Sequence, residues 1–187
     1  MNKLVTLINE KDLKKRVKEL GKEIEKDYKG EDITFICILK GSIHFFSDLT
    51  RSVKNNTYNE FMKVSSYGAS TTSSGEIHVN LDLNEKIQGK NIIVVEDIID
   101  SGRTLSYLLK YLSIKKPKTL KLCTLLNKPS RREIKGLKVD YIGFTIPDYF
   151  VVGYGLDLDQ QYRNIPCIKC FVKSKEEEIE VKNFKTK

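Results

Sequence analysis

Three carboxylates that stand close together, Glu96, Asp97 and Asp100, are the side chains of this sequence whose types and spacing most directly suggest chemistry. They follow an apolar run at 92–95 and precede a small-residue turn at 101–104. Neighbouring carboxylates can accept hydrogen bonds from ribose hydroxyls, or bind Mg²⁺, a hard cation that takes oxygen ligands. Asp100, at the turn, is a candidate general acid or base.

The turn itself, SGRT at 101–104, has the composition of a phosphate site. A glycine-containing turn that leads into a helix directs backbone amides and the positive end of the helix dipole at one point. The chain has no GxxxxGK sequence, and the GYG at 153–155 lacks the third glycine of a dinucleotide fingerprint. The alternative is that Asp100 or Ser101 only caps the helix, which leaves the two preceding carboxylates without a role.

The segments around these residues predict an α/β fold. Apolar residues at helical spacing predict an amphipathic helix at 10–28, and further helices are expected from Gly41 and after the 101–104 turn. The segments expected as strands are 33–39, 60–67, 77–83, 92–95, 120–126, 141–146 and 167–172. Buried strands that alternate with helices indicate a central, mostly parallel sheet flanked by helices, in which ligands bind beyond the carboxyl ends of the strands.

The length of 187 residues favours a single domain at 1–187. Small polar residues predict a mobile loop at about 66–77, and the charged tail at 173–187 is expected to be frayed. No apolar run approaches the length needed to span a bilayer, and the N-terminus lacks the apolar stretch of a signal peptide. We therefore expect a cytoplasmic protein.

The net charge of +8 is unevenly distributed. Ten basic residues and one acidic residue lie between Lys110 and Lys138, so this segment carries +9 and the rest of the chain −1. Such a segment indicates either a polyanionic partner, such as nucleic acid or a phosphate-rich small molecule, or a solvated lysine-rich face. The CxxC formed by Cys167 and Cys170 has no second pair, and is a weak indication of zinc or redox chemistry.

Five ordered segments resemble motifs of type I phosphoribosyltransferases. VVEDIIDSGRTL at 94–105 resembles their phosphoribosyl-diphosphate (PRPP) signature, and its EDIID form resembles the hypoxanthine–guanine branch. The other four are ILKGS at 38–42, SSYG at 65–68, LLNKPSRR at 125–132 and IPDYFVVGYGLDLDQQYR at 146–163. The resemblance covers about residues 33–170. It implies the type I phosphoribosyltransferase fold, with a small hood formed by the chain ends.

The resemblance also implies a reaction, the Mg²⁺-dependent transfer of a phosphoribosyl group in purine salvage. N9 of hypoxanthine or guanine attacks C1 of PRPP, pyrophosphate leaves, and the product is IMP or GMP. The implied partners are two small-molecule substrates, PRPP and a 6-oxopurine, without a membrane and without nucleic acid. The family suggests a homodimer or homotetramer.

Each matching residue acquires an implied role. Asp100 is the expected catalytic residue, which exchanges a proton with N7 of the purine. The residues expected to bind PRPP and its 5′-phosphate are Glu96, Asp97, Asp100, Ser101, Gly102, Arg103 and Thr104. Those expected at the pyrophosphate are Lys40, Gly41 and Arg163, and those on the flexible loop are Ser66 and Tyr67. The purine-binding set is Lys128, Phe150, Val151 and Asp157, and the Mg²⁺-binding set is Glu96, Asp97 and Asp157.

The base preference follows from hydrogen-bond complementarity at Lys128. An ammonium group can only donate, so it favours a 6-oxo acceptor over the 6-amino group of adenine. Backbone carbonyls near Val151 or Asp157 would accept from the 2-amino group of guanine and oppose the 2-oxo group of xanthine. Two alternatives remain open: a xanthine-preferring phosphoribosyltransferase, and a PRPP- or nucleotide-sensing regulator that binds nucleic acid. The basic segment fits the regulator, whereas the intact purine motifs oppose it.

Overall fold

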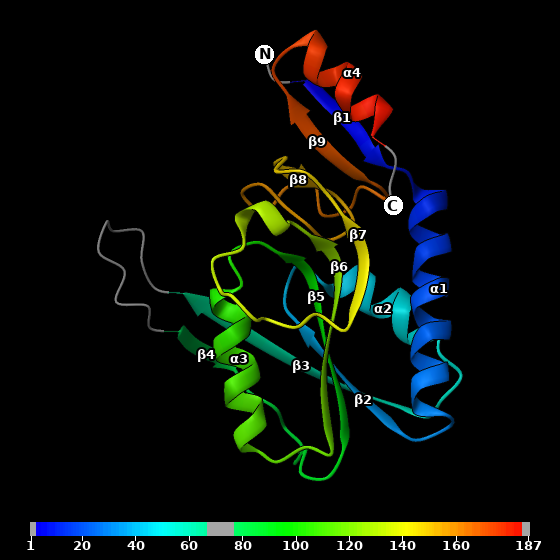
Figure 1. The fold of residues 1–187 in the computed structure, drawn as a ribbon, viewed down its shortest axis with the longest axis vertical. Coiled ribbons are helices and arrows are strands. Elements are labelled where there is room, and N and C mark those ends of the chain that lie inside the picture. The colour runs from blue at the N-terminus through cyan, green and yellow to red at the C-terminus, as the bar shows by residue number, and fades with distance from the viewer. Residues whose placement is uncertain (1–2, 67–76, 185–187) are drawn as a thin grey trace.

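The computed structural model describes residues 3–66 and 77–184, which form two β-sheets and four α-helices within these ranges (Figure 1). The elements in chain order are β1 (Lys3–Ile8), α1 (Glu10–Tyr28), β2 (Ile33–Ile38), α2 (Ile43–Arg51), β3 (Thr57–Ser66), β4 (Ile77–Leu81), β5 (Asn91–Ile99), α3 (Arg103–Ile114), β6 (Thr119–Asn127), the 3₁₀ helix η1 (Pro129–Arg131), β7 (Tyr141–Thr145), β8 (Val151–Val152), β9 (Ile168–Val172) and α4 (Lys175–Asn183). No helix in the described part of the chain is long and apolar enough to cross a membrane.

The main sheet has the strand order β4-β3-β2-β5-β6-β7. All neighbouring strands are parallel except β4, which runs antiparallel to β3 at one edge. Helices α1 and α2 pack on one face of this sheet, and α3 packs on the other (Figure 1). This arrangement confirms the predicted α/β class with a central, mostly parallel sheet.

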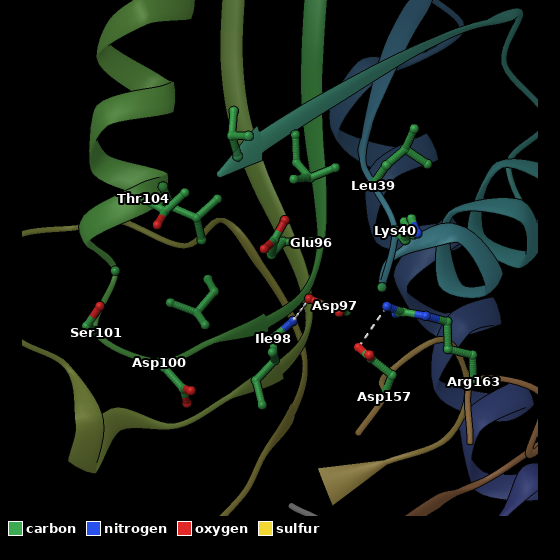
Figure 2. Close-up of a pocket in the computed structure, with 16 residues that line it drawn as sticks. Leu39, Lys40, Glu96, Asp97, Ile98, Asp100, Ser101, Thr104, Asp157 and Arg163 are labelled. Atoms are coloured by element: carbon green, nitrogen blue, oxygen red, sulfur yellow. Dashed lines mark hydrogen bonds and ion pairs between the residues drawn. The ribbon is translucent and has the colours of Figure 1, made fainter. Parts of the chain in front are cut away.

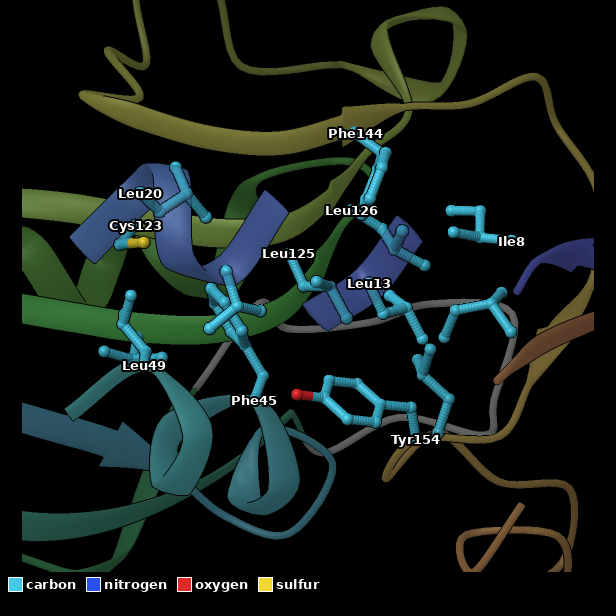
Figure 3. Packing of buried hydrophobic residues seen from close by; sticks show 14 of the residues in the cluster. Ile8, Leu13, Leu20, Phe45, Leu49, Cys123, Leu125, Leu126, Phe144 and Tyr154 are labelled. Carbon is cyan, nitrogen blue, oxygen red and sulfur yellow. The ribbon is translucent and has the colours of Figure 1, made fainter. Parts of the chain in front are cut away.

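Strand β2 shows why apolar runs form the centre of the sheet. All six of its residues are buried, because both of its faces are covered by helices. Phe35 and Cys37 point to the side of α1 and α2, while Ile36 and Ile38 belong to the cluster under α3. Figure 3 shows the first of these clusters, in which side chains of α1 and α2 meet those of the sheet.

Helix α1 forms at the predicted residues because capping interactions at both ends enclose a continuous apolar face. The side-chain oxygen of Asn9 accepts a hydrogen bond from the amide of Asp12 at 2.9 Å, which caps the first turn. The chain leaves the helix at Lys29, which has a left-handed backbone and whose amide donates to the Glu25 carbonyl at 2.9 Å. The apolar stripe of the helix, including Leu20, is buried against the sheet.

The strand order of the main sheet reverses between β2 and β5, and a crevice opens there. From β2 the chain adds β3 on one side, and from β5 it adds β6 and β7 on the other. Strand β2 pairs with β5 only as far as Cys37↔Val95, whereas β5 stays paired with β6 to Ile99↔Asn127. Beyond Val95 one edge of β5 is therefore open, at the position where such sheets bind ligands.

The smaller sheet, β1-β9-β8, joins the two ends of the chain and carries α4. Figure 1 shows this hood beyond one end of the main sheet. The expected hood is therefore present, although its strands β1 and β8 were not predicted from the sequence. Strand β8 has two residues, too few for a periodic pattern, and β1 mixes exposed and buried positions.

The expectation of a frayed tail is wrong for Lys175–Asn183, which forms α4. The hydroxyl of Ser174 accepts a hydrogen bond from the amide of Glu177 at 3.2 Å and caps this helix. Val181 is 2% exposed, and Glu178 forms an ion pair with Lys3 at 2.7 Å. A single buried residue in a charged segment gives little hydrophobic periodicity, which is why the composition was misleading.

Replacing Leu20 by alanine tests the packing of α1 on the sheet. Leu20 is fully buried, so Leu20→Ala should lower the free energy of unfolding by about 2–5 kcal/mol through lost burial and the cavity left behind. Urea unfolding followed by circular dichroism measures this difference. Lys22→Ala, on the exposed face of the same helix, is the control. Equal stabilities of the two variants would contradict the packing described here.

Candidate functional site

A cavity of about 340 Å³ opens at the carboxyl ends of β2 and β5 (Figure 2). Five parts of the chain meet there: the end of β2 with the residues after it, β3 through Val64, the end of β5 with its following turn, the start of α3, and Asp157 with Arg163. The lining residues are Ile38, Leu39, Lys40, Gly41, Val64, Glu96, Asp97, Ile98, Ile99, Asp100, Ser101, Gly102, Thr104, Leu105, Asp157 and Arg163. Figure 2 shows Ser101 and Thr104 on one side of the cavity and Lys40 and Arg163 on the other.

Glu96 and Asp97 lie between these two sides, on the open edge of β5 (Figure 2). Neither carboxylate forms an ion pair with a residue in the described ranges, and Glu96 Oε2 is buried without a hydrogen-bond partner there. The Asp97 carboxylate accepts a hydrogen bond from the amide of Ile98 at 2.7 Å. Burial raises the pKa of Asp97 to about 6, and burial together with the neighbouring Asp97 raises the pKa of Glu96. These carboxylates can be satisfied by a cation or by hydroxyl donors that a ligand supplies.

The approach of three chain segments to Asp97 requires glycine at two positions. A Cβ atom at Gly41 would lie 1.6 Å from Asp97 Oδ2. A Cβ atom at Gly155, whose φ is +104°, would lie 1.9 Å from the carbonyl oxygen of Gly41. The loop after β2 therefore fits between the carboxylate and the segment that leads to Asp157 only because both side chains are absent.

The turn at 101–104 leaves the N-terminus of α3 open to the cavity. The N-cap is Gly102, with φ of +80°, and it makes no side-chain capping hydrogen bond. Neither Asp100 nor Ser101 occupies the capping position, and the Ser101 hydroxyl accepts only a long bond, 3.4 Å, from the amide of Arg103. The first amides of a helix have no partner within it, so they can bind an anion here.

Arg103 is the member of this turn that does not line the cavity. Its side chain is exposed and forms an ion pair with Glu133 at 2.5 Å. The groups of this turn that could bind a phosphate in the cavity are therefore the backbone amides and the hydroxyls of Ser101 and Thr104.

Lys128, directly after β6, is a buried cation between two carboxylates. Its side chain is 7% exposed, and its Nζ lies 3.6 Å from Asp100 Oδ1 and 3.7 Å from Asp148 Oδ1. The backbone amide of Lys128 donates to the carbonyl of Ile99 at 3.1 Å, which fixes the residue beside β5. A buried ammonium group in this position can make a charge-assisted hydrogen bond to an acceptor in the cavity.

A second cavity, of about 510 Å³, lies under the hood and is lined by Asp148, Tyr149, Phe150, Leu158, Phe171, Lys173 and Glu177. The ring of Phe150 is 54% exposed and its centroid is 6.0 Å from that of Phe171. Val151 is buried in β8, beside Phe150. Lys128 itself lines neither cavity, but its Nζ pairs with Asp100, which lines the first, and with Asp148, which lines the second. It therefore lies between the first, polar cavity and the second, aromatic cavity.

The far rim of the first cavity is a network around Arg163. Its guanidinium forms an ion pair with Asp157 at 2.8 Å and donates to the carbonyl of Gly155 at 2.7 Å. The side-chain oxygen of Gln160 accepts from Arg163 at 3.2 Å and from Lys40 at 3.3 Å. The side chains of Lys40 and Arg163 therefore lie across the cavity from the helix N-terminus, and a ligand with two anionic ends would find hydrogen-bond donors at both.

The structure brings together most of the predicted site residues, but not all in one place. Arg103 points away from the cavity, and Phe150 lines the second cavity. Ser66 ends β3, while Tyr67 and most of the predicted mobile loop lie outside the described residues. Asp148 and Gln160 were not singled out although both lie in the 146–163 motif, because their contacts with Lys128 and Lys40 join positions that are distant in sequence.

The candidate metal ligands do not form a closed site by themselves. Asp157 is held by Arg163, and no group of three or more His, Cys, Asp or Glu side chains within the described ranges could hold a metal ion. The donor chemistry at Glu96 and Asp97 nevertheless fits Mg²⁺, which is commonly bound by one or two carboxylates together with oxygens of a phosphate substrate.

This chain resembles known proteins in family, sequence and fold. The family described as "Phosphoribosyl transferase domain" matches residues 6–159. The hypoxanthine phosphoribosyltransferase of Escherichia coli is 47% identical over 164 residues, which cover 87% of this chain and 92% of that protein. A bifunctional protein TilS/HprT of Listeria monocytogenes is 46% identical over 162 residues, and the matched part of this chain spans only 25% of that relative's length.

A solved structure agrees with these sequence matches. The crystal structure of a hypoxanthine-guanine phosphoribosyltransferase from Bacillus anthracis superposes with a TM-score of 0.85 and 50% sequence identity. The match covers 89% of this chain and 98% of that one.

The carboxylate pair predicts a particular pH dependence of stability. Because the folded-state pKa values of Glu96 and Asp97 are raised, their contribution to stability is complete below their unfolded values and is lost as pH rises. Between about pH 4 and pH 7, the free energy of unfolding of the ligand-free protein should fall by about 1–2 kcal/mol more in the wild type than in Glu96→Gln/Asp97→Asn. Urea unfolding at several pH values measures it. Parallel pH profiles of the two proteins would show that the pair is not strained by burial.

Proposed function

We propose that this chain, which belongs to the phosphoribosyl transferase domain family, transfers the phosphoribosyl group of PRPP to N9 of hypoxanthine or guanine. The observation that carries this proposal is the position of Lys128, buried at the junction of the polar cavity and the aromatic one. A purine bound across that junction would offer its 6-oxo group to the ammonium and its face to Phe150. The product would be IMP or GMP, with release of pyrophosphate.

The polar cavity suits PRPP because its lining alternates in charge along the length of such a molecule. We assign the 5′-phosphate to the amides at 101–104, and the ribose hydroxyls to Glu96 and Asp97. The pyrophosphate is assigned to Lys40, Gly41 and Arg163, across the cavity from the helix N-terminus. Separate cationic sites at the two anionic ends would hold C1 in a fixed position and favour attack from the side of the second cavity.

Glu96 and Asp97 are the residues proposed to hold Mg²⁺, and Asp157 becomes a third if its ion pair with Arg163 opens. When bound, the cation supplies positive charge that stabilises the departing pyrophosphate. The unpartnered oxygen of Glu96 supports this assignment, since a buried carboxylate without a donor is costly unless a ligand satisfies it.

Asp100 is proposed to exchange a proton with N7 of the purine while Lys128 donates to the 6-oxo group. The two side chains lie 3.6 Å apart, so a single planar base can meet both. The ammonium group of Lys128 can only donate hydrogen bonds, and so can the 6-amino group of adenine. The two groups could therefore not bond to each other. Hypoxanthine and guanine are therefore the proposed bases, with xanthine poor and adenine excluded.

The alternative of a nucleic-acid-binding regulator finds little support in the surface charge. The lysines of the 110–138 segment meet carboxylates from elsewhere in the chain, at 2.5 Å for Lys118–Glu31, 2.8 Å for Lys121–Asp27 and 2.8 Å for Lys138–Asp140. Much of the +9 charge counted along the sequence is thus neutralised in space. The segment is better explained as a paired, solvated face than as a polyanion site.

Two further expectations are kept as proposals. Residues 1–187 are proposed to act as one domain, since the chain ends pair with each other in the hood. A homodimer or homotetramer is proposed because apolar side chains are exposed on α2 and β3: Ile43, Tyr58 and Phe61, at 42%, 54% and 39%.

A base panel tests the proposed function. Purified protein with Mg²⁺ and PRPP is given hypoxanthine, guanine, xanthine, adenine or uracil, and turnover is followed by ultraviolet absorbance. Hypoxanthine and guanine should react, and a chelator should stop both reactions. Efficient use of adenine would overturn the argument from Lys128, and the absence of turnover with every base would overturn the proposed function itself.

Replacing Asp100 by asparagine tests the proton transfer. Asp100→Asn should fold and bind PRPP normally, yet lower kcat for hypoxanthine by roughly 10²–10⁴-fold, the usual worth of general acid–base catalysis. Asp159→Asn, an exposed residue with the same change of charge, is the control. If kcat of Asp100→Asn stays near the wild-type value, Asp100 orients groups but carries no proton.

A further inference from the structure

The segment after β6 is attached to the turn that carries Asp100 through several backbone hydrogen bonds. The amides of Glu133 and Ile134 both donate to the carbonyl of Ser101, at 3.0 Å and 3.2 Å. The ladder between β5 and β6 ends one residue before Asp100, at the pair Ile99↔Asn127. The peptide of Asp100 therefore lies between two anchored positions without a ladder partner of its own.

Arg132 spans this gap. Its Nε donates to the carbonyl of Asp100 at 3.2 Å, and its Nη2 donates to Asn127 Oδ1 at 2.7 Å. Asn127 is 9% exposed and is the last residue of β6, so the guanidinium is fixed at one end to the edge of the sheet. The planar guanidinium of arginine directs donors on two separate nitrogens at two acceptors in fixed directions, whereas lysine has a single, freely rotating ammonium nitrogen.

The aliphatic part of the Arg132 side chain packs against the turn at Gly102. A Cβ atom at Gly102 would lie 3.2 Å from the Cδ of Arg132 and 2.8 Å from Leu137, so the turn rests directly on this side chain. Arg132 lines neither the polar cavity nor the aromatic one. Its hydrogen bonds and close packing are therefore with the end of β6 and with the turn that bears Asp100.

The neighbouring cations of the same segment do not share this geometry. Arg131 is exposed and lies 3.6 Å from Asp148, and the pair of Arg103 with Glu133 is exposed at both ends. Exposed pairs of this kind contribute little to structure. Among the cations from 128 to 135, only Arg132 joins the end of the sheet to the Asp100 peptide.

We propose that Arg132 is a positioning residue: by tying the Asp100 carbonyl to the end of β6, it sets the Asp100 carboxylate against Lys128 and the bound purine. This inference rests on the proposed function. Without the tie, the Asp100 peptide can rotate between Ile99 and Ser101, and the carboxylate leaves the position from which it can reach N7. A displacement of about 1 Å from a reactive geometry can lower a rate by about 10²-fold.

Replacing Arg132 by glutamine tests the proposal. Arg132→Gln should lower kcat for hypoxanthine by roughly 10- to 100-fold, while the KM for PRPP stays close to the wild-type value. Lys135→Gln, which removes a positive charge from an exposed position on the same segment, should have wild-type kcat. Arg132→Lys keeps the charge and much of the stem, so it should fold even if glutamine does not, and it should still lose kcat because the two-point contact is gone.

A double-mutant cycle separates positioning from general structural support. If Arg132 acts through Asp100, Arg132→Gln should have little further effect on kcat in an Asp100→Asn background, because the group that it positions is already disabled. The same fractional loss in both backgrounds would overturn the proposal, as would full activity of Arg132→Lys or an equal effect of Lys135→Gln. If the wild-type protein shows no turnover, both the proposed function and this inference are overturned. If the wild type is active and substitution of Arg132 leaves kcat unchanged, only the inference is overturned.

Discussion

The site depends on one electrostatic constraint: two adjacent carboxylates, Glu96 and Asp97, are held at the open edge of a buried strand without an ion pair to any of the described residues. Strand β5 extends several residues beyond its last pair with β2, and Glu96 and Asp97 lie in the part whose edge toward β2 is unpaired. Their raised pKa values record the cost of this placement. The nearest cation-bearing network, at Arg163, is directed instead at Asp157, so the pair at β5 is left for a ligand to satisfy.

The surrounding structure can be understood as the means of keeping that pair exposed on one side only. Glycine at 41 and 155 lets two loops close against Asp97. Gly102 begins α3 without a side-chain cap and leaves its amides facing the same space. The helix amides lie at one end of the cavity and the side chains of Lys40 and Arg163 at the other, so hydrogen-bond donors are available at both ends. This arrangement suits the proposed substrate, which is anionic at both ends.

Lys128 lies between the polar cavity and the aromatic one. The segment that follows it is hydrogen-bonded to the turn that carries Asp100. The carbonyl of Ser101 and the carbonyl of Asp100 are both held by residues at 132–134. Lys128, proposed to recognise the base, and Asp100, proposed to exchange the proton, therefore lie on segments that are hydrogen-bonded to each other, at the ends of adjacent strands. Such a connection fixes the distance between two groups that must act on the same ring.

The sequence was informative where the chemistry is local. Glu96 to Thr104 is one continuous motif, so residue types, order and the apolar run before it predicted the end of the strand and the glycine turn into the next helix. That this turn binds a phosphate stays a prediction. It was less informative where contacts join distant residues: the Lys128–Asp148 pair is separated by 20 positions, and the ion pairs of the basic segment reach back to Asp27 and Glu31. The hood was predicted only through resemblance, because β8 is too short, and α4 too charged, to show a buried face.

Ligand binding is expected to relieve the unfavourable burial of Glu96 and Asp97. Calorimetric titration of PRPP with Mg²⁺ into the wild type and into Glu96→Gln/Asp97→Asn, between about pH 5.5 and pH 7.5, tests it most directly. Ionisation of the substrate contributes equally to both proteins. The wild type should bind more tightly than the variant, and its affinity should rise more steeply with pH, because its carboxylates must lose protons to bind. Equal affinities with parallel pH profiles would contradict the account.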